Sequence, residues 1–408
     1  MLTVSDSGCL LRFRLLETQQ LLNRKHISIG VKMGDQEIYQ KFMEYMNNPL
    51  WEFTESEHLM PMIKAFLTPD EAEFLTGFPQ SSRTLEQIAD IKNMDPDELL
   101  PIIKAHCRKG TIYEGMRGDS VRYRLWTAVE MFVRPAFWAD EVEETAKAMA
   151  PHSNKYYMDG WYDQKKPFPH PELRTIPISQ TVESPTGFMP FEDVMQVVEN
   201  YEYYTVSQCP CRARHNLDPD YQDSPFPMEV CLHFNELGHY IVDNGLGREI
   251  TKEETLEILK KSADAGLVHG VYNVEENPDT ICNCDLEYCT YFKPYHQLGF
   301  DKAHDPSNYL VSTTSDLCKA CGLCVRRCPM DALQLKFSTE ATNKFRKAVV
   351  VQEENCIGCG VCVHKCKAKA ITLKRRETTT QPHKTIKDLV NLNAMAALSA
   401  KGLMDKKN

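Results

Sequence analysis

The sequence predicts a multidomain α+β protein, and three observations support this fold class. The chain has 408 residues, which is more than one compact hydrophobic core normally holds. Helix-start signals followed by two short strands occupy residues 61–134 and set an N-terminal unit apart. Fourteen of the 16 cysteines fall between Cys209 and Cys366, in an upstream and a downstream group. We therefore expect a helical N-terminal domain with a hairpin, a cysteine-rich α+β central domain and a separate C-terminal cysteine domain.

The N-terminal unit carries clear signals for helix starts. Thr68 and Thr84 each stand three residues before a Glu or Gln, which is the capping-box pattern. A third helix is expected after Asp95, which is followed by a proline at the first helical position. Residues 111–126 contain two short strands around a Gly-Asp turn and predict a hairpin. Three helices and a hairpin predict a winged-helix-like domain over residues 61–134.

The charge of this domain bears on what it binds. Residues 61–134 hold 10 Lys plus Arg and 11 Asp plus Glu, so the net charge is −1. A winged helix that reads DNA presents a basic face, because phosphate contacts dominate its affinity. We therefore favour a protein-docking or dimerisation module, in which the partner is another protein or a second copy of the chain, over a DNA reader.

Charge and hydropathy along the whole chain argue against a nucleic-acid coat protein, a membrane-spanning protein and a secreted protein. With 47 Lys plus Arg and 57 Asp plus Glu, the chain has a net charge of −10, which is atypical of a nucleic-acid coat. No run of 18 apolar residues predicts a transmembrane helix, and no signal peptide is recognisable. The many closely spaced thiols suit a reducing, cytoplasmic setting better than a disulfide framework. Met33 opens a helix-like stretch and is an alternative start to Met1.

Composition shifts divide the chain further. Helix and strand signals precede the upstream cysteines, and a capping box at Thr251 predicts a helix ending at Gly266. Residues 386–404 predict a further helix, in a segment (residues 374–408) whose net charge is +5. The expected units are an N-terminal extension and helix at 1–60, the winged-helix-like domain at 61–134, a connector at 135–206, the cysteine-rich central domain at 207–308, the C-terminal cysteine domain at 309–374 and a basic tail or helix at 375–408.

Two tandem motifs dominate the C-terminal cysteine domain. Each has the spacing C-x-x-C-x-x-C-x-x-x-C. Three thiolates, each separated from the next by two residues, wrap one cubane iron–sulfur cluster, and the fourth cysteine of each motif ligates the other cluster. The spacing therefore predicts two [4Fe-4S] clusters. One is assigned to Cys318, Cys321, Cys324 and Cys366, and the other to Cys356, Cys359, Cys362 and Cys328.

This segment resembles the bacterial-type two-cluster ferredoxin domain over residues 309–374. Pro329 follows the first motif as in that family, whereas Lys367 stands where a second proline is usual. The stretch between Cys328 and Cys356 is longer than in the smallest such domains, which predicts an enlarged hairpin. The resemblance implies one-electron transfer with a redox partner protein. Lys365, Lys367 and Lys369 form either a solvated face or a docking edge for an acidic carrier.

Six further cysteines form an upstream constellation with two C-x-C pairs, and they are Cys209, Cys211, Cys231, Cys282, Cys284 and Cys289. We favour a third metal centre here, and an iron–sulfur cluster over zinc; redox-active thiols without metal are the other alternative. His215, His233 and His239 are candidate extra ligands, each more typical of a core or surface histidine. Arg212 and Arg214 would offset thiolate charge.

A broader resemblance covers most of the chain. Cys209-Pro210-Cys211-Arg212 and Ile281-Cys282-Asn283-Cys284, together with the tandem motifs, are similar to bacterial and archaeal 4Fe-4S binding, ferredoxin-family proteins. The leading hypothesis is an iron–sulfur electron-transfer protein. One alternative is an oxidoreductase whose central metal site is catalytic. The other is a redox-sensing winged-helix regulator. No catalytic residue, donor or acceptor is indicated.

Overall fold

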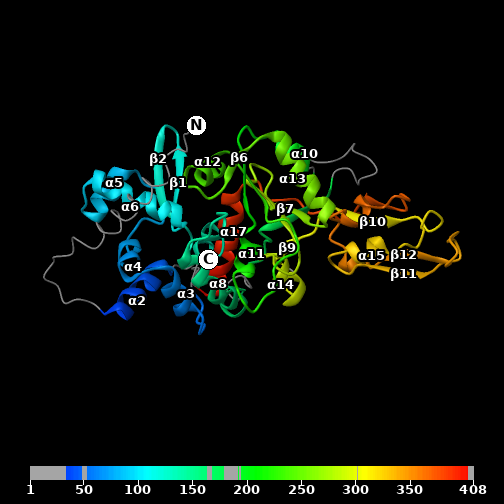
Figure 1. Cartoon of the computed structure of the whole chain (residues 1–408), viewed down its shortest axis with the longest axis horizontal. Helices are drawn as coiled ribbons and strands as arrows, with labels where there is room; N and C mark the ends of the chain where they lie inside the picture. The colour runs from blue at the N-terminus through cyan, green and yellow to red at the C-terminus, as the bar shows by residue number, and fades with distance from the viewer. Residues whose placement is uncertain are drawn as a thin grey trace, which may run out of the picture.

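The computed structural model describes residues 34–47, 53–162, 168–178, 192, 194–300 and 302–402. The alternative start at Met33 lies outside these residues. The chain is a mixture of helices and strands arranged along one axis, with the N-terminal helices at one end and the tandem cysteine loops at the other (Figure 1). Within the described part of the chain, no helix is long and apolar enough to cross a membrane.

The N-terminal part consists of helices and one hairpin. Its elements are α2 (Asp35–Met46), α3 (Leu59–Phe66), α4 (Pro69–Leu75), α5 (Leu85–Lys92), α6 (Pro96–Lys109), the strands β1 (Ile112–Arg117) and β2 (Ser120–Leu125), α7 (Ala128–Val133), a 3-10 turn (Pro135–Phe137), α8 (Glu144–Tyr156) and a π-helical turn (Tyr157–Trp161).

The expected helix starts and the hairpin are present. Thr68 accepts a hydrogen bond from the Glu71 amide, and the Glu71 carboxylate accepts one from the Thr68 amide, which completes the capping box of α4. Thr84 caps α5 in the same way. The strands β1 and β2 pair antiparallel from Ile112↔Leu125 to Arg117↔Ser120. The winged-helix-like assignment of these elements remains a prediction.

The segment expected to be a connector contains α8. This helix packs against α3 and buries Ala146, Met149 and Ala150 along one face. These side chains belong to a core that also includes Leu237 and Tyr240 from the central domain. The N-terminal helices and the central domain are therefore joined by continuous apolar packing.

A seven-stranded sheet forms the central domain, with the order β6-β4-β5-β8-β7-β3-β9. All neighbouring strands are antiparallel except β3 and β9. The strands are β3 (Leu173–Ile176), β4 (Tyr204–Gln208), β5 (Glu229–Phe234), β6 (Arg248–Ile250), β7 (Val268–Tyr272), β8 (Thr280–Cys284) and β9 (His304–Asp305). The helices are α10 (Val194–Glu199), α11 (Pro210–Asn216), α12 (Asn235–Asp243), α13 (Lys252–Ala265) and α14 (Phe292–Gln297).

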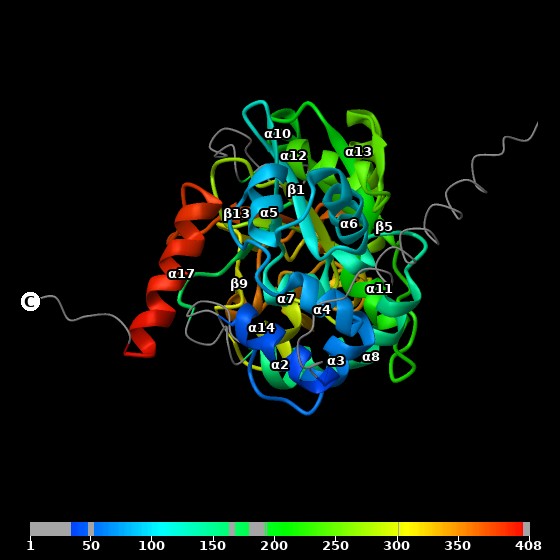
Figure 2. The same ribbon diagram turned by 90° about the vertical axis from the view of Figure 1, so that its left-hand side faces the viewer.

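The C-terminal part contains two short antiparallel sheets, β10–β13 and β11–β12. Its elements are β10 (Tyr309–Thr313), α15 (Leu323–Arg327), β11 (Leu333–Phe337), β12 (Lys347–Val351), a 3-10 turn (Glu353–Asn355), α16 (Val361–His364), β13 (Ile371–Arg375) and α17 (Ile386–Ala400). The helix α17 lies along one side of the body (Figure 2) and is held there by two hydrogen bonds between Asn393 and the His170 backbone.

Candidate metal centres

All six upstream cysteines line one pocket in the central domain. The pocket encloses about 510 Å³. Two thiols come from the start of α11, three from the adjacent strands β5 and β8, and one from the segment after β8; they are Cys209, Cys211, Cys231, Cys282, Cys284 and Cys289. The structure thus brings together residues that are up to 80 positions apart in the sequence.

Strand geometry explains the C-x-C spacing on β8. Residues two apart on a strand point to the same face, so Cys282 and Cys284 both face the pocket. Leu232 of β5 is paired with Ile281 of β8, which places Cys231 opposite Cys282. In the other pair, Cys209 is the N-cap residue of α11 and Cys211 lies in its first turn.

The six thiols form one unbroken series of contacts. Each sulfur influences the pKa of its neighbours in the order Cys209, Cys211, Cys289, Cys284, Cys282 and Cys231. The second thiol from each end of this series, Cys211 or Cys282, has a lowered pKa, whereas the pKa values of the other four thiols are raised. The pKa of Cys211 is held well below its usual value, because Cys209 and Cys289 hydrogen-bond to its sulfur. Cys231 and Cys284 hold the pKa of Cys282 low in the same way.

Buried guanidinium groups surround this sulfur-rich pocket. Arg214 and Arg134 also act to lower the pKa values of Cys211 and Cys282, respectively. Arg134 follows α7 in the N-terminal part and lines the pocket. Its position 75 residues before the first pocket cysteine gave no sequence signal. These cations would offset the negative charge of a thiolate-ligated centre.

Arg212 also acts as a structural brace. Its guanidinium donates to the Asn283 carbonyl at 3.0 Å and to the Pro227 carbonyl at 2.8 Å. It also forms an ion pair with Asp285 at 3.4 Å. These contacts tie α11 to the chain that carries Cys282 and Cys284. The Cys211 Sγ and Thr290 Oγ1 atoms lie 3.0 Å apart, a contact that sequence reasoning missed.

None of the three candidate histidines lines the thiol pocket. His215 contacts the Cys211 carbonyl through Nδ1 at 2.7 Å, so its ring faces backbone rather than sulfur. His233 lies buried between the hydroxyls of Ser207 and Thr280. The ring of His239 stacks on Tyr203. All three are engaged in packing or hydrogen bonds elsewhere.

The eight downstream cysteines lie around two further pockets. Cys318, Cys321, Cys324 and Cys366 line one of about 770 Å³, and Cys328, Cys356, Cys359 and Cys362 line another of about 310 Å³; Cys362 borders both. Each grouping therefore draws three cysteines from one motif and one from the other. Gly322 and Gly360 adopt left-handed backbone conformations just before α15 and α16, which allows these tight turns.

The donor chemistry of these pockets fits iron–sulfur clusters. The four thiols assigned to each pocket, with Cys362 counted in the second, match the four iron vertices of a cubane. Among the described residues, no group of three or more His, Cys, Asp or Glu side chains converges as for a single metal ion. That holds for the tandem loops as well as for the six-thiol pocket.

The loop that carries Cys356 and Cys359 is attached to the central domain. The Ser307 amide donates to the Ile357 carbonyl at 3.0 Å, and the Ile178 amide donates to the Cys359 carbonyl at 3.2 Å. Arg376 donates to the Cys356 carbonyl. In the other cysteine loop, the thiol of Cys321 is exposed.

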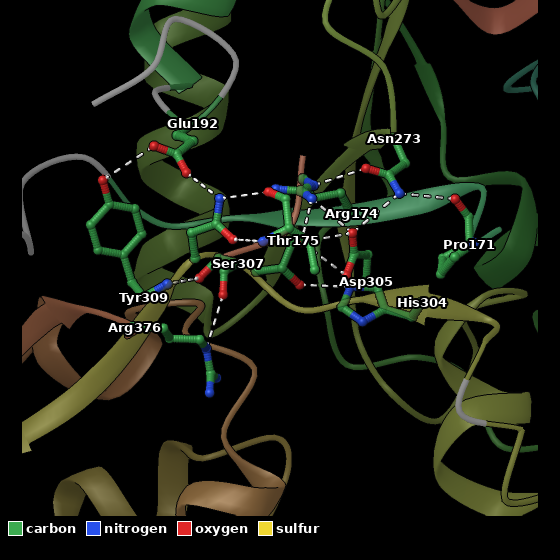
Figure 3. A network of polar contacts seen from close by, with 12 residues as sticks. Pro171, Arg174, Thr175, Glu192, Asn273, His304, Asp305, Ser307, Tyr309 and Arg376 are labelled. Carbon is green, nitrogen blue, oxygen red and sulfur yellow. Dashed lines mark hydrogen bonds and ion pairs between the residues drawn. The ribbon is translucent and has the colours of Figure 1, made fainter. Parts of the chain in front are cut away.

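A buried polar network stabilises the region where the C-terminal part of the chain meets the central domain (Figure 3). Arg174 of β3 donates to Asn273 Oδ1 and to Asp305 Oδ2, each at 2.8 Å. The side chain of Arg174 is 2% exposed. The guanidinium also reaches Thr380 at 2.6 Å, in the segment that follows β13. The network therefore fixes the sheet, the start of the C-terminal domain and the chain after it.

Comparison with known protein families decides the character of the C-terminal domain. Residues 317–370 match the 4Fe-4S dicluster domain. This is a ferredoxin-type iron–sulfur domain. Such a domain has an electron-transfer role, which in general implies a redox partner. The match covers 54 of the 408 residues, and the six-thiol pocket lies outside it. No curated protein matches the chain.

Proposed function

We propose that the chain is a three-centre iron–sulfur electron relay. Two [4Fe-4S] clusters occupy the ferredoxin-type domain, and a third iron–sulfur centre occupies the six-thiol pocket. Cys318, Cys321, Cys324 and Cys366 hold the first cluster, and Cys356, Cys359, Cys362 and Cys328 hold the second. When bound, these two clusters would supply the route for electrons between a redox partner and the third centre.

The observation that carries this proposal is the meeting of all six upstream thiols in one pocket. A structural zinc ion and a cubane each take four ligands, so the count of six thiols does not by itself choose between them. Thiols in continuous contact, with two buried guanidinium groups nearby, suit a centre that shares its charge among several thiolates. We favour a third iron–sulfur centre over zinc because Cys284 and Cys289 share a hydrophobic core with cysteines of the second cluster.

The packing between the pockets supports an electron route. Cys284 and Cys289 belong to the same continuous core as Cys356, Cys359 and Cys362. The amide of Ile178 and the guanidinium of Arg376 fix the loop of the second cluster at this core. When bound, each cluster accepts or releases one electron, and the surrounding apolar side chains exclude water from its sulfurs. This packing supports the second cluster as the bridge between the first cluster and the third centre.

Replacing Cys324 with alanine is expected to remove the first cluster while the second cluster and the third centre remain. The iron content should fall by about four atoms per chain, with loss of one electron-spin signal on reduction. Cys107→Ala is the matched control, because Cys107 is a buried thiol of α6 outside all three cysteine pockets. Iron content and spin signals unchanged from the wild type would contradict the ligand assignment.

A second candidate, an oxidoreductase with a catalytic central centre, is favoured by a neighbouring aromatic pocket. This pocket of about 320 Å³ shares Thr290 and Tyr291 with the six-thiol pocket. Its walls include Tyr157, Trp161 and Tyr162 from the π-helical turn and the residue after it, a feature that often marks functional sites. Turnover of an added oxidant by the reduced protein would assign this activity.

The regulator alternative has less support from the charges of α6. Two of its basic side chains are used inside the fold, because Lys104 pairs with Glu114 at 2.5 Å and Lys109 pairs with Glu71 at 2.7 Å. Arg108 remains exposed. A helix that reads a DNA groove needs its cations free for phosphate and base contacts. These pairings favour a protein-docking role for the N-terminal domain.

A further inference from the structure

The ferredoxin-type domain carries a charge opposite to that of the rest of the chain. Residues 309–374 contain 11 Lys plus Arg and five Asp plus Glu, a net charge of +6. Since the whole chain has a net charge of −10, the remaining residues sum to −16. This domain forms one end of the molecule (Figure 1). The positive charge is thus displaced toward the end that carries the first cluster pocket.

Exposed basic side chains border that pocket directly. Lys319 and Lys367 line it, next to Cys318 and Cys366 in sequence, and Cys321 on its rim is exposed. An electron entering from outside therefore meets the first cluster before the second. The second pocket lies against the central domain, where backbone hydrogen bonds cover its loop.

The hairpin β11–β12 extends the same surface beyond the pocket. Leu335 and Val349 are cross-strand partners that line the pocket. Phe337 and Lys347 are the next pair on the same face, because side chains two residues apart point the same way. Phe337 is 70% exposed. A large aromatic ring left in water beside cationic groups is typical of a protein-binding surface.

These cations are not neutralised within the fold. We define the distal basic surface as Lys319, Phe337, Lys344, Arg346, Lys347 and Lys367. Within the described ranges, none of its five cations forms an ion pair, whereas the nearby Lys365 is paired with Asp264. An uncompensated cationic surface attracts an acidic partner and steers its approach.

We propose that the distal basic surface is the docking site for an acidic electron-carrier protein, which exchanges electrons with the first cluster. The inference rests on the proposed electron relay and specifies the partner of its outer cluster. One electron leaves the reduced carrier and enters the first cluster, so the carrier is oxidised and the cluster reduced by the same single electron. The exposed Cys321 on the rim of the first cluster pocket favours a redox protein over a nucleic acid, which neither supplies nor accepts such electrons.

The test measures binding of an acidic plant-type [2Fe-2S] ferredoxin to the full-length protein, purified without oxygen, at low and at high salt. The triple variant Lys344→Glu, Arg346→Glu, Lys347→Glu changes the hairpin and leaves both cluster pockets intact. It is expected to weaken binding about tenfold or more at low salt, with less loss at high salt. The variant Phe337→Ala is expected to weaken binding without changing the salt dependence.

A matched control separates local from overall charge. The variant Lys41→Glu, Arg117→Glu, Lys147→Glu makes the same change in net charge on N-terminal elements outside the ferredoxin-type domain. It should bind within about twofold of the wild type, because the N-terminal elements lie away from the end of the molecule that carries the docking site, and salt screens charges at long range (Figure 1). Equal losses in the two triple variants, or no loss in the hairpin variant, would overturn the proposal.

Two further sets of measurements test whether another molecule occupies the distal basic surface and whether the clusters themselves are present. If a single-stranded oligonucleotide binds more tightly than the ferredoxin does, the surface binds nucleic acid and the proposal is overturned. If the protein self-associates in a salt-dependent way and the hairpin variant abolishes this, the surface binds a second copy of the chain and the proposal is likewise overturned. Iron content and reduction by dithionite are measured on each variant first. Missing clusters would contradict the proposed relay, whereas intact clusters without ferredoxin binding would contradict the docking surface alone.

Discussion

Asp305→Ala is expected to destabilise the protein by about 3–5 kcal/mol, which is the cost of removing one partner from a buried ion pair. Asp305 is the charged partner of Arg174, whose side chain is 2% exposed. It also accepts from Asn273 at 3.2 Å and from Thr380. Its loss leaves the guanidinium charge in a largely dry site. Equilibrium denaturation of the anaerobically purified protein measures the change.

Glu276→Ala is the matched control for this effect. It breaks the ion pair of Glu276 with Lys384, which also joins the central domain to the chain after β13. Both side chains of this pair are largely exposed, so its loss should cost less than about 1 kcal/mol. An Asp305→Ala variant no less stable than Glu276→Ala would show that the network in Figure 3 does not brace the junction.

Cys282→Ala is expected to have the largest effect on the third centre. Cys282 contacts two other pocket thiols, Cys231 and Cys284, and its loss breaks the series of sulfur contacts. The protein should lose the iron in excess of about eight atoms per chain, while the two ferredoxin clusters keep their spin signals. Cys107→Ala again serves as the control. Full retention of iron by the Cys282 variant would contradict a ligand role for this residue.

The sequence predicted those features that depend on local spacing. The capping residues Thr68 and Thr84 mark helix starts because their side chains bond to amides only three residues away. The match to residues 317–370 supports the iron–sulfur domain inferred from the tandem motifs. The two C-x-C pairs meet as expected of ligands to one site, although the ligand set itself remains a proposal.

Features that depend on contacts between distant segments were not predictable. Arg134 reaches the thiol pocket only because the N-terminal part packs on the central domain through a shared core. The segment assigned as a connector contains α8, whose apolar face became recognisable only with its partner α3 in place. The bond from Arg174 to Thr380 joins residues 206 positions apart. No local pattern specifies such pairings.

The most direct test of the three-centre relay is the content of iron, acid-labile sulfide and zinc in protein purified without oxygen. The proposal predicts clearly more than about eight iron and eight sulfide per chain, with no zinc, because the six-thiol pocket adds a third iron–sulfur centre to two cubanes. About eight iron and eight sulfide with one zinc would contradict it. The pocket would then be a structural zinc site, and the protein a two-cluster carrier.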